Sequence, residues 1–483
     1  MSGSRILVTT RKKPVATGMG SCQVFHLEEL SDEGCWLILS QLAYMGKGNE
    51  LREKLEDIGR EIAKKCKGLP LAAKTLGGLL REKNTRNEWQ NILNSEIWKL
   101  KVAEKGIFRP LLLSYYDLPS EIRPCLLYCA IFPKDFDFWP TELIKHWMAH
   151  GYLNCKENLG MEEGKGGEYF NYLASRSFFQ DYEKDEDGNV IECKMHDMVH
   201  DFVQYLTDEE IVAVEFDNSE TVRLDLSSKK THHLRVKISK EDQFPVSIKG
   251  IENLRSLLAG GQQCDVTGEA LAAFFKGAKC LRLFEFAKEW YGHVNVKEIP
   301  NEIGKLIHLR YLNFCGCGNL KELPEEVCEL HNLQYLNLDG CHNLEKLPDG
   351  MGKLINLRYF YSKYCFGLQY YPKGIGRLTS LRELIPIRAR VDGKDAAKEF
   401  SVGDLENLDL LRGYLQIKVV GNVVDVGEVK RAKLHNKRHL DRLDLTHGEI
   451  NPNGVIQALN LPPSFDISIV EVLRWISFKR RST

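Results

Sequence analysis

The chain has 483 residues, of which 43% are hydrophobic and 28% are charged, and its formal net charge is −1. This length favours two to four domains, and the composition excludes a disordered chain. A net charge so close to zero excludes a global attraction to nucleic acid or acidic membranes, and no apolar run approaches the roughly 18 residues of a transmembrane helix. The fourteen cysteines are scattered singly, which is typical of the reducing cytosol or nucleus.

The first predicted elements are a strand and two helices. Residues 5–10 form a β-branched run typical of a central parallel strand, and because a lone strand cannot bury both faces we expect the chain to begin inside a domain. Apolar residues then recur at helical spacing, which predicts an amphipathic helix through Leu51, Leu55, Ile58 and Ile62. Gly68 can end this helix in a left-handed conformation, and Pro70 suits the start of the next one, over 71–80.

The middle of the chain is predicted to fold as a winged helix. Helices are predicted over 108–116, 140–153 and 168–175, followed by two short strands, 177–183 and 190–196, around an Asp-Gly turn. The glycine-rich stretch 162–170 lacks the P-loop pattern and is predicted to be a loop. A further helix runs through Val199, Val203 and Leu206, with Asp197 as its N-cap.

Two histidines, His196 and His200, lie four residues apart at the start of this last helix. The stretch lacks the central glutamate of the H-E-x-x-H pattern, so no zinc site is predicted. Two interpretations stay open. In one, Asp197 is the cap while His200 and Asp201 are solvated; in the other, His196 lies at the corner between hairpin and helix and bonds a phosphate oxygen.

The second half of the chain is repetitive, because four sets of residues share a period of 24 residues. The sets are Leu309, Leu333, Leu357 and Leu381; Cys317, Cys341 and Cys365; Leu320, Leu344 and Leu368; and Pro300, Pro324, Pro348 and Pro372. Looser copies occur around Leu257, Phe284 and Leu443. The pattern predicts a leucine-rich solenoid in which each repeat adds one strand to a concave binding sheet and the cysteines belong to the core.

These stretches together resemble the plant nucleotide-binding, leucine-rich-repeat disease-resistance proteins, most closely the coiled-coil subclass. GSRILVTTR (3–11) resembles the sensor strand of their nucleotide-binding domain, and CKGLPLAAKTLGGLL (66–80) resembles their GLPL motif. CLLYCAIFPKD (125–135) resembles the opening of their winged-helix region, and Met195, His196 and Asp197 resemble their MHD triplet. The resemblance covers the chain from Gly3 to about Pro463.

The resemblance implies a switch between an ADP-bound closed state and an ATP-bound open state. It also implies that the repeats keep the protein in the closed state until a pathogen signal is sensed. It implies that Arg11 senses the γ-phosphate, that Leu69 and Pro70 pack on the adenine, and that His196 bonds the β-phosphate of ADP. It also implies a cytoplasmic protein, with a peripheral membrane or nuclear location as alternatives, whose repeats bind a pathogen effector or a guarded host protein.

The chain departs from the family in lacking the upstream coiled coil, the P-loop and the acidic strand that handles Mg²⁺. Without the P-loop amides and lysine the β- and γ-phosphates lose their anchors. We therefore expect an N-terminally truncated fragment with no ATP hydrolysis, no catalytic residue, no bound metal and at best weak ADP binding. The C-terminal stretch from residue 463 keeps no leucine-rich spacing and is predicted to be a divergent tail.

The predicted fold is therefore a multidomain α/β chain. Residues 1–25 form a remnant of a P-loop NTPase sheet, 26–104 a helical ARC subdomain, 105–212 a winged-helix subdomain, 213–462 the leucine-rich repeats, and 463–483 the tail.

Two alternative functions stay open. In the first, the chain is the C-terminal part of a longer ATP/ADP-switched receptor whose start was misassigned. In the second, it is a winged-helix regulator of nucleic acid, because such folds place a helix in the major groove. Helix 140–152 carries only Lys145 and two histidines, and its acidic neighbours Glu142, Asp135 and Asp137 would repel phosphate. We therefore expect no nucleic-acid partner.

Overall fold

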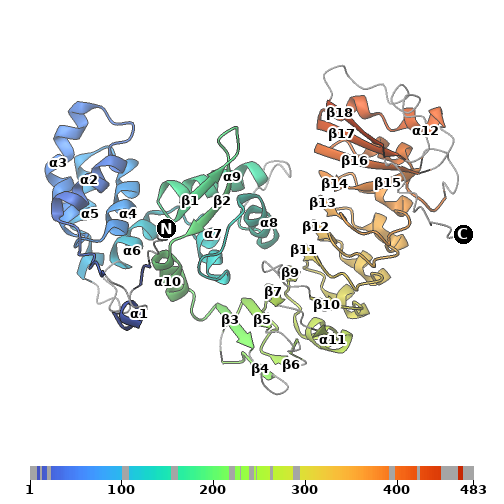
Figure 1. The fold of residues 1–483 in the computed structure, drawn as a ribbon, viewed down its shortest axis with the longest axis horizontal. Helices are drawn as coiled ribbons and strands as arrows, with labels where there is room; N and C mark the ends of the chain where they lie inside the picture. Colours follow the sequence, from blue (N-terminus) through green and yellow to red (C-terminus); the bar gives the residue numbers. More distant parts are fainter. Residues whose placement is uncertain are drawn as a thin grey trace, which may run out of the picture. The chain divides into compact units, whose positions relative to one another are not determined.

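The computed structural model describes residues 8–10, 13–18, 23–99, 108–153, 162–216, 223–228, 230–238, 244–245, 247–261, 265–286, 294–390, 397–420, 425–447 and 466–471. The chain divides into two compact units (Figure 1). The first comprises Met1–Pro119 with Leu173–Phe178, and the second comprises Ser120–Tyr172 with Phe179–Thr483. In the described residues, no helix is both long and apolar enough to cross a bilayer.

The first unit is helical. Its elements are α1 (Lys13–Gly18), α2 (Asp32–Ala43), α3 (Asn49–Lys64), α4 (Pro70–Arg81), α5 (Arg86–Leu93), the 3-10 turn η1 (Glu96–Lys99) and α6 (Phe108–Asp117). Helix α3 buries Leu55, Ile58 and Ile62 on one face, which confirms the predicted amphipathic helix. Gly68 has a φ of +72°, and Pro70 is the first residue of α4, as predicted.

Close helix packing in this unit depends on small side chains. A Cβ at Gly77 of α4 would lie 2.9 Å from the Leu39 carbonyl oxygen of α2, so a larger residue would push the two helices apart. The unit also contains one buried arginine. Arg176 Nη2 lies 2.8 Å from a Glu82 oxygen and 2.9 Å from an Asp117 oxygen, so its charge is compensated.

The predicted strand at 5–10 lies mostly outside the described residues, and so does Arg11. Val8, Thr9 and Thr10 are described; they are exposed and are not in a strand. For these three residues the prediction is wrong. A central parallel strand requires neighbouring strands on both sides, and the sheets of the described residues do not include this segment.

The second unit begins with the predicted winged-helix arrangement. Its elements are α7 (Arg123–Tyr128), the 3-10 turn η2 (Cys129–Ile131), α8 (Pro140–His150), α9 (Glu162–Ser175, whose last residues belong to the first unit), the antiparallel strands β1 (Phe179–Lys184) and β2 (Val190–Met195), and α10 (Asp197–Leu206). Gly151, with a φ of +75°, ends α8, and Gly188, with a φ of +83°, forms the hairpin turn.

Helix α9 begins earlier than predicted. The sequence predicts a loop at 162–170, whereas the structure places the first turns of α9 there, so that prediction is wrong. A Cβ at Gly166 would overlap the Ile144 side chain of α8, so this glycine serves close helix packing instead of a turn. Glu162 and Glu163 lie in the first turn of α9, where the helix dipole favours negative charge.

The N-cap of α10 is His196 instead of Asp197. His196 Nδ1 accepts a hydrogen bond from the Met198 backbone N–H at 3.0 Å, and Asp197 is the first helical residue. The first of the two interpretations also predicted a solvated His200. That residue is buried, with Nε2 2.7 Å from the Phe132 carbonyl oxygen, and Asp201 pairs with Lys134. This interpretation is therefore wrong.

The repeats form a parallel sheet of eight strands (Figure 1). In spatial order they are β14 (Glu383–Ile385), β13 (Tyr359–Tyr361), β12 (Tyr335–Asn337), β11 (Tyr311–Asn313), β9 (Leu283–Phe286), β7 (Ser256–Gly261), β5 (His233–Ile238) and β3 (Ile211–Phe216). Tyr311 pairs with Tyr335, and Tyr335 pairs with Tyr359. This register confirms the 24-residue period, because equivalent residues of successive repeats lie side by side.

The periodic residues form the core of the solenoid. Leu309, Leu333, Leu357 and Leu381 are fully buried. Cys341 Sγ donates to the Phe314 carbonyl oxygen at 3.3 Å, and Cys365 Sγ donates to the Leu338 carbonyl oxygen at 3.1 Å. Burial raises the pKa of the Cys365 thiol to about 12, so the group stays protonated. The prediction that these cysteines belong to the core is confirmed.

A second parallel sheet follows, in the order β15 (Ile387–Arg390), β16 (Arg412–Val420), β17 (His439–His447) and β18 (Asp466–Glu471). Strand β18 lies in the predicted divergent tail and pairs in parallel with β17. The remaining elements are β4 (Arg223–Asp225), β6 (Ser247–Lys249), β8 (Asp265–Val266), β10 (Asn295–Val296), α11 (Gly268–Gly277), α12 (Val426–Arg431), and the 3-10 turns η3 (Asn301–Lys305), η4 (Glu325–Glu329), η5 (Asp349–Lys353), η6 (Lys373–Arg377), η7 (Val402–Asn407) and η8 (Leu434–Asn436).

One repeat carries a tyrosine where its neighbours carry glycine. Gly316 and Gly340 have φ values of +81° and +74°, and the equivalent Tyr364 has a φ of +61°. A residue with a Cβ is strained in this conformation by roughly 1 kcal/mol.

We expect Tyr364→Gly to raise the free energy of unfolding by up to about 1 kcal/mol, measured by urea denaturation. Tyr364→Ala keeps the strain and should give no gain; equal stabilisation by both variants would contradict this explanation.

Candidate functional site

The concave face of the eight-stranded sheet carries a column of tyrosines. Side chains alternate along each strand, so Leu312 and Leu336 enter the core while Tyr311 and Tyr335 lie on the opposite face. The Tyr311 and Tyr335 rings stack with centroids 4.0 Å apart and an interplanar angle of 4°. These two tyrosines are only 1% and 4% exposed, because the winged helix covers this face.

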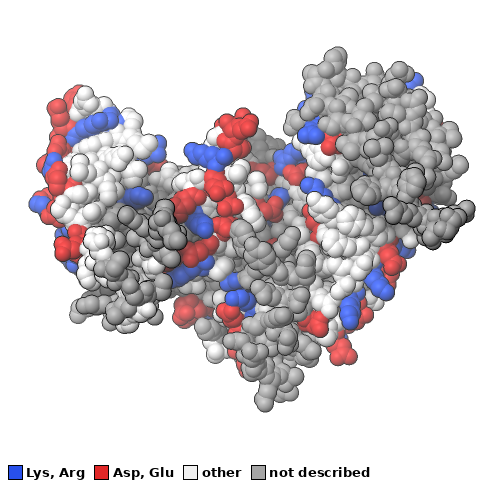
Figure 2. All heavy atoms as spheres, viewed as in Figure 1, with Lys and Arg blue, Asp and Glu red and all other residues white. Residues whose placement is uncertain are grey.

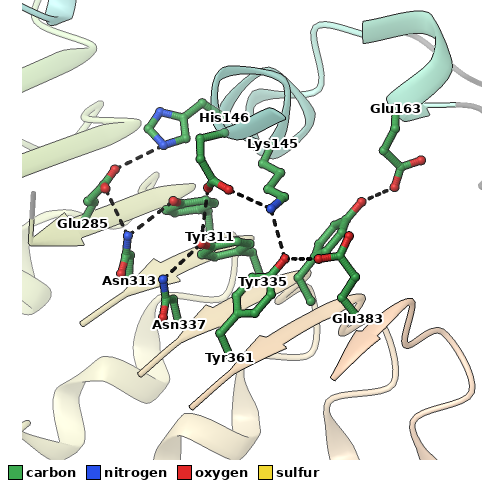
Figure 3. Close-up of polar contacts among 12 residues, drawn as sticks. Lys145, His146, Glu163, Glu285, Tyr311, Asn313, Tyr335, Asn337, Tyr361 and Glu383 are labelled. Atoms are coloured by element: carbon green, nitrogen blue, oxygen red, sulfur yellow. Dashed lines mark hydrogen bonds and ion pairs between the residues drawn. The ribbon is translucent and has the colours of Figure 1, made fainter. Parts of the chain in front are cut away.

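The ammonium of Lys145 in α8 lies close to three tyrosines of this face, and Figure 3 shows it next to the Tyr361 hydroxyl. Its Nζ lies 5.3, 4.9 and 5.1 Å from the ring centroids of Tyr335, Tyr359 and Tyr361, which together we call the tyrosine cage. Lys145 also donates to the Tyr361 hydroxyl at 3.1 Å and pairs with Glu142 at 2.8 Å. Glu142 in turn accepts from the Tyr335 hydroxyl at 3.3 Å. The ammonium is therefore held by ring faces as well as by charge.

His146 links α8 to an earlier strand. Its Nδ1 is 3.0 Å from the Tyr128 hydroxyl, and its Nε2 is 3.1 Å from a carboxylate oxygen of Glu285 in β9. Glu285 also accepts from the Asn313 side chain of β11 at 3.0 Å. The side chains of α8 thus contact strands β9, β11, β12 and β13.

The first turn of α9 meets three arginines, which we call the arginine row: Arg358, Arg382 and Arg412. Glu162 pairs with Arg358, and Glu163 pairs with Arg382. Arg412 Nη2 lies 3.3 Å from the same Glu163 carboxylate. Arg358 and Arg382 are only 4% and 6% exposed, so loss of the α9 carboxylates would leave buried cations without their partners.

The C-terminal end of α8 packs on the earlier repeats through buried histidines. Arg282 donates to the His150 carbonyl oxygen at 2.7 Å. His150 Nε2 lies 3.1 Å from Ser256 Oγ, which is 2.5 Å from His233 Nδ1. The Tyr128 ring packs against both imidazoles, with centroid distances of 4.8 Å to His150 and 5.3 Å to His233. We call His150, His233 and Ser256 the histidine junction.

Burial sets the protonation of these groups. It lowers the pKa of His233 to about 3 and that of His150 well below the ordinary value, and nearby arginines add to both shifts. Burial raises the pKa of Tyr361, with a further contribution from Glu383, so the phenol stays neutral. Burial would also raise the pKa of Glu163, but the Tyr359 hydroxyl and the Arg382 guanidinium outweigh it and hold that pKa below the usual value.

The winged helix does not fill the concave face completely. A cleft of about 1270 Å³ lies beside these contacts. The winged helix lines it with Phe136 and Trp139, and the repeats line it with Tyr335, Tyr361 and Glu383. Among the described residues, no group of three or more His, Cys, Asp or Glu is arranged to hold a metal ion. The cleft is lined mainly by aromatic and other apolar side chains, with charged groups such as Glu383 among them.

The residues that the resemblance assigns to nucleotide lie in both units. Leu69 is the partly buried N-cap residue of α4 and Pro70 is its exposed first residue, so the structure brings these two together in the first unit. His196 lies in the second unit, and Arg11 lies outside the described residues. The nucleotide-binding role of all four stays a prediction.

The sequence reasoning did not find the tyrosine cage or the arginine row. A signal for the cage was present, because Tyr311, Tyr335 and Tyr359 share the 24-residue period of the core leucines. In a strand of alternating side chains, a tyrosine next to a buried leucine must lie on the outer face. Periodic outer residues therefore mark a continuous surface column.

The fold defines a protein that joins a winged helix to a leucine-rich-repeat solenoid, and comparison with known proteins agrees. The description "Disease resistance protein Winged helix domain" matches residues 131–203, and "Leucine-rich repeat region" matches residues 253–480. Both matches support the predicted fold class. With the relatives described next, they show that the chain is similar to plant disease-resistance proteins in its winged helix and its leucine-rich repeats.

Three curated plant proteins illustrate the relationship. The putative disease resistance protein RGA1 of Solanum bulbocastanum is 37% identical over 315 residues, which cover 65% of this chain and 28% of that protein. RGA4 of the same plant is 46% identical over 204 residues, covering 42% of this chain and 20% of RGA4. The putative disease resistance RPP13-like protein 1 of Arabidopsis thaliana is 37% identical over 207 residues, covering 43% and 19%. The chain thus spans less than a third of these relatives.

The nucleic-acid alternative gains no support from this geometry. Lys145 and His146 of α8 contact the concave sheet, so the helix that would enter a major groove is already covered on that face. On the face shown in Figure 2, lysines and arginines are interspersed with aspartates and glutamates. Binding to phosphate backbones would instead favour a basic stripe.

The histidine junction makes stability depend on pH. The folded-state pKa values of His150 and His233 lie below the unfolded value, so their contribution is fully present above about pH 6.5 and is lost as pH falls toward the folded values. At pH 5 we expect a loss of about 2 kcal/mol from His233 and a further loss in the same direction from His150. Urea unfolding at pH 7 and pH 5 measures this loss.

The double variant His150→Gln with His233→Gln serves as the comparison for this measurement. Because glutamine does not titrate in this range, the double variant should lose much less stability than the wild type between the two pH values. An equal loss in both proteins would contradict the assignment.

Proposed function

We propose that the chain acts in a plant defence receptor of the cytoplasm, in which the repeats bind a pathogen effector or a host protein and the winged helix occupies the concave face at rest. The observation that carries this proposal is the docking of α8 and α9 on that face, through the tyrosine cage and the arginine row. The names of the relatives support the defence role, and the leucine-rich repeats support binding to protein. The proposed activity is binding, not catalysis.

Competition for one surface would connect binding to activation. The tyrosines and arginines that α8 and α9 contact are the outer residues of the repeats, which are also the residues that a partner on the concave face would touch. A ligand shifts a two-state equilibrium only through its different affinity for the two states. A partner that binds these residues excludes the winged helix, and so favours the open state.

A charge reversal at Glu163 tests this proposal. Glu163→Arg places a cation against Arg382 and Arg412 and should release α9 from the arginine row. Expressed in leaves without a pathogen, this variant should cause defence cell death, whereas the wild type should not. The second-site change Arg382→Glu should restore part of the contact and reduce cell death, since it again pairs opposite charges.

Glu168→Arg is the matched control, because Glu168 lies on the same helix but is exposed. It should behave as the wild type. In urea unfolding, a double-mutant cycle between Glu163→Gln and Arg382→Gln should give a coupling free energy of about 1–3 kcal/mol. Cell death that is the same for Glu163→Arg, Glu168→Arg and the wild type would overturn the proposed role.

The nucleotide residues extend this proposal. Arg11, Leu69, Pro70 and His196 would bind ADP, with ATP favouring the open state. Because His196 Nδ1 accepts from Met198 N–H, the neutral ring carries its proton on Nε2, and a bond to phosphate would come from that atom. An ADP β-phosphate is a chemically suitable acceptor for this donor.

Calorimetry with ADP tests the role of His196. His196→Asn should lower ADP affinity while α10 stays intact, because asparagine is also a good N-cap. His196→Ala should lose both the cap and the donor, with a cost of about 1 kcal/mol in stability. Unchanged ADP affinity in His196→Asn would limit the role of the histidine to capping.

A separate test concerns hydrolysis. Clear Mg²⁺-dependent ATP turnover above that of an Arg11→Ala variant would contradict the expected lack of hydrolysis.

A further inference from the structure

We propose that the tyrosine cage is a binding site for the ammonium group of a lysine side chain on a partner protein, which replaces Lys145 when the partner binds. This inference rests on the proposed function, because it names the chemical group with which a partner would displace the winged helix from the concave face. Lys145 is then an internal ligand that occupies the site at rest.

The cage is built by the repeats themselves. The Tyr335 and Tyr361 ring centroids lie 5.5 Å apart with an interplanar angle of 61°, and the Tyr335 and Tyr359 centroids lie 6.1 Å apart with an angle of 46°, so both rings pack against Tyr335. Asn337 donates to the Tyr335 hydroxyl at 3.2 Å, and Tyr361 donates to Glu383. These supports come from strands β12 to β14 and remain when α8 departs, whereas the bonds of the Tyr335 hydroxyl to Glu142 and of the Tyr359 hydroxyl to Glu163 are lost.

The chemistry of the cage fits an ammonium. Two ring faces, those of Tyr335 and Tyr359 at 5.3 and 4.9 Å, and the Tyr361 hydroxyl at 3.1 Å attract a compact cation, and the attraction grows when water is excluded. The Lys145 side chain is only 11% exposed, so the cage desolvates the group it holds. The carboxylate paired with Lys145 is Glu142, which lies on α8 and leaves with it. A lysine from a partner would meet the same rings and the same Tyr361 hydroxyl.

The adjoining cleft supplies access. Its lining includes Tyr335, Tyr359, Tyr361 and Glu383, so an incoming segment can reach the edge of the cage before α8 has left. Glu383 is bonded to Tyr361 and lies 3.9 Å from Arg412, so an incoming ammonium would share this carboxylate with that arginine. The partner is thus a protein segment that presents a lysine.

The test uses the full chain with Lys145→Met, which removes the resident ammonium from the cage and leaves a flexible, uncharged side chain that a probe can displace. The probe is Nα-acetyl-lysine N-methylamide, and binding is followed by saturation-transfer NMR and calorimetry. We expect the variant to bind the probe at least tenfold more tightly than the wild type. Adding Tyr361→Leu should abolish binding, while adding Tyr361→Phe, which keeps the ring, should weaken it only a few-fold.

Lys165→Met is the matched control, because Lys165 Nζ lies 5.5 Å from one ring, that of Tyr169, and its loss does not empty the cage. It should bind the probe no better than the wild type. Nα-acetyl-norleucine N-methylamide, which has no charge, should not bind the Lys145→Met chain. The trimethyl-lysine form of the probe distinguishes a methylated from an unmodified lysine as the preferred ligand; tighter binding of either form supports the ammonium site.

The proposal is overturned if the folded Lys145→Met chain binds no ammonium probe, or if it binds the norleucine probe equally well. Circular dichroism establishes folding, and Lys145→Gln replaces the variant if Lys145→Met unfolds. The outcome is independent of the proposed receptor function. If the probe does not bind but Glu163→Arg still triggers cell death, only the proposed ammonium site is rejected. If the probe binds but Glu163→Arg triggers no cell death, the proposed receptor function is rejected and the ammonium site stands.

Discussion

In-register pairing of the parallel repeat strands is the constraint on which the rest of the second unit depends. Because Tyr311, Tyr335 and Tyr359 are direct neighbours in the sheet, each position of the repeat becomes a column along the solenoid. Inner columns of leucine and cysteine make the core, while outer columns make the surface that the winged helix covers. Successive strands lie roughly 4.8 Å apart, so aromatic rings in one column are close enough to stack. A single periodicity thus determines both the interior and the binding face.

The covering contact holds charged side chains of the winged helix and the repeats in largely buried positions. Lys145, Glu163 and Arg382 are each largely buried, and each depends on partners from the opposite side of the contact. A buried charge that loses its partner is strongly destabilising, so partial separation is disfavoured. The paired charges therefore stabilise the contact as a whole. Neutral phenols complete it, since burial keeps Tyr361 protonated through its raised pKa.

Local periodicity explains what the sequence could predict. Helix α3, the hairpin and the 24-residue repeats were predicted correctly, because residue spacing alone specifies them. The start of α9 was missed, since Gly166 is explained by its contact with Ile144 on another helix. The cap of α10 was misassigned by one residue, because His196 accepts a bond that aspartate more commonly accepts. The tyrosine cage joins Lys145 to residues about 190 to 216 positions away, and no local pattern reports such a contact.

The modular stacking of the repeats has an evolutionary consequence. Each unit touches mainly its neighbours, so unequal recombination could insert or delete one 24-residue unit without damaging the core. An insertion between β12 and β13 would nevertheless shift Arg358 and all later strands by one step relative to Tyr335, and α8 and α9 could no longer engage both at once. Natural selection on the resting state should therefore conserve the repeat number between β9 and β16, while strands beyond β16 remain open to expansion and diversification.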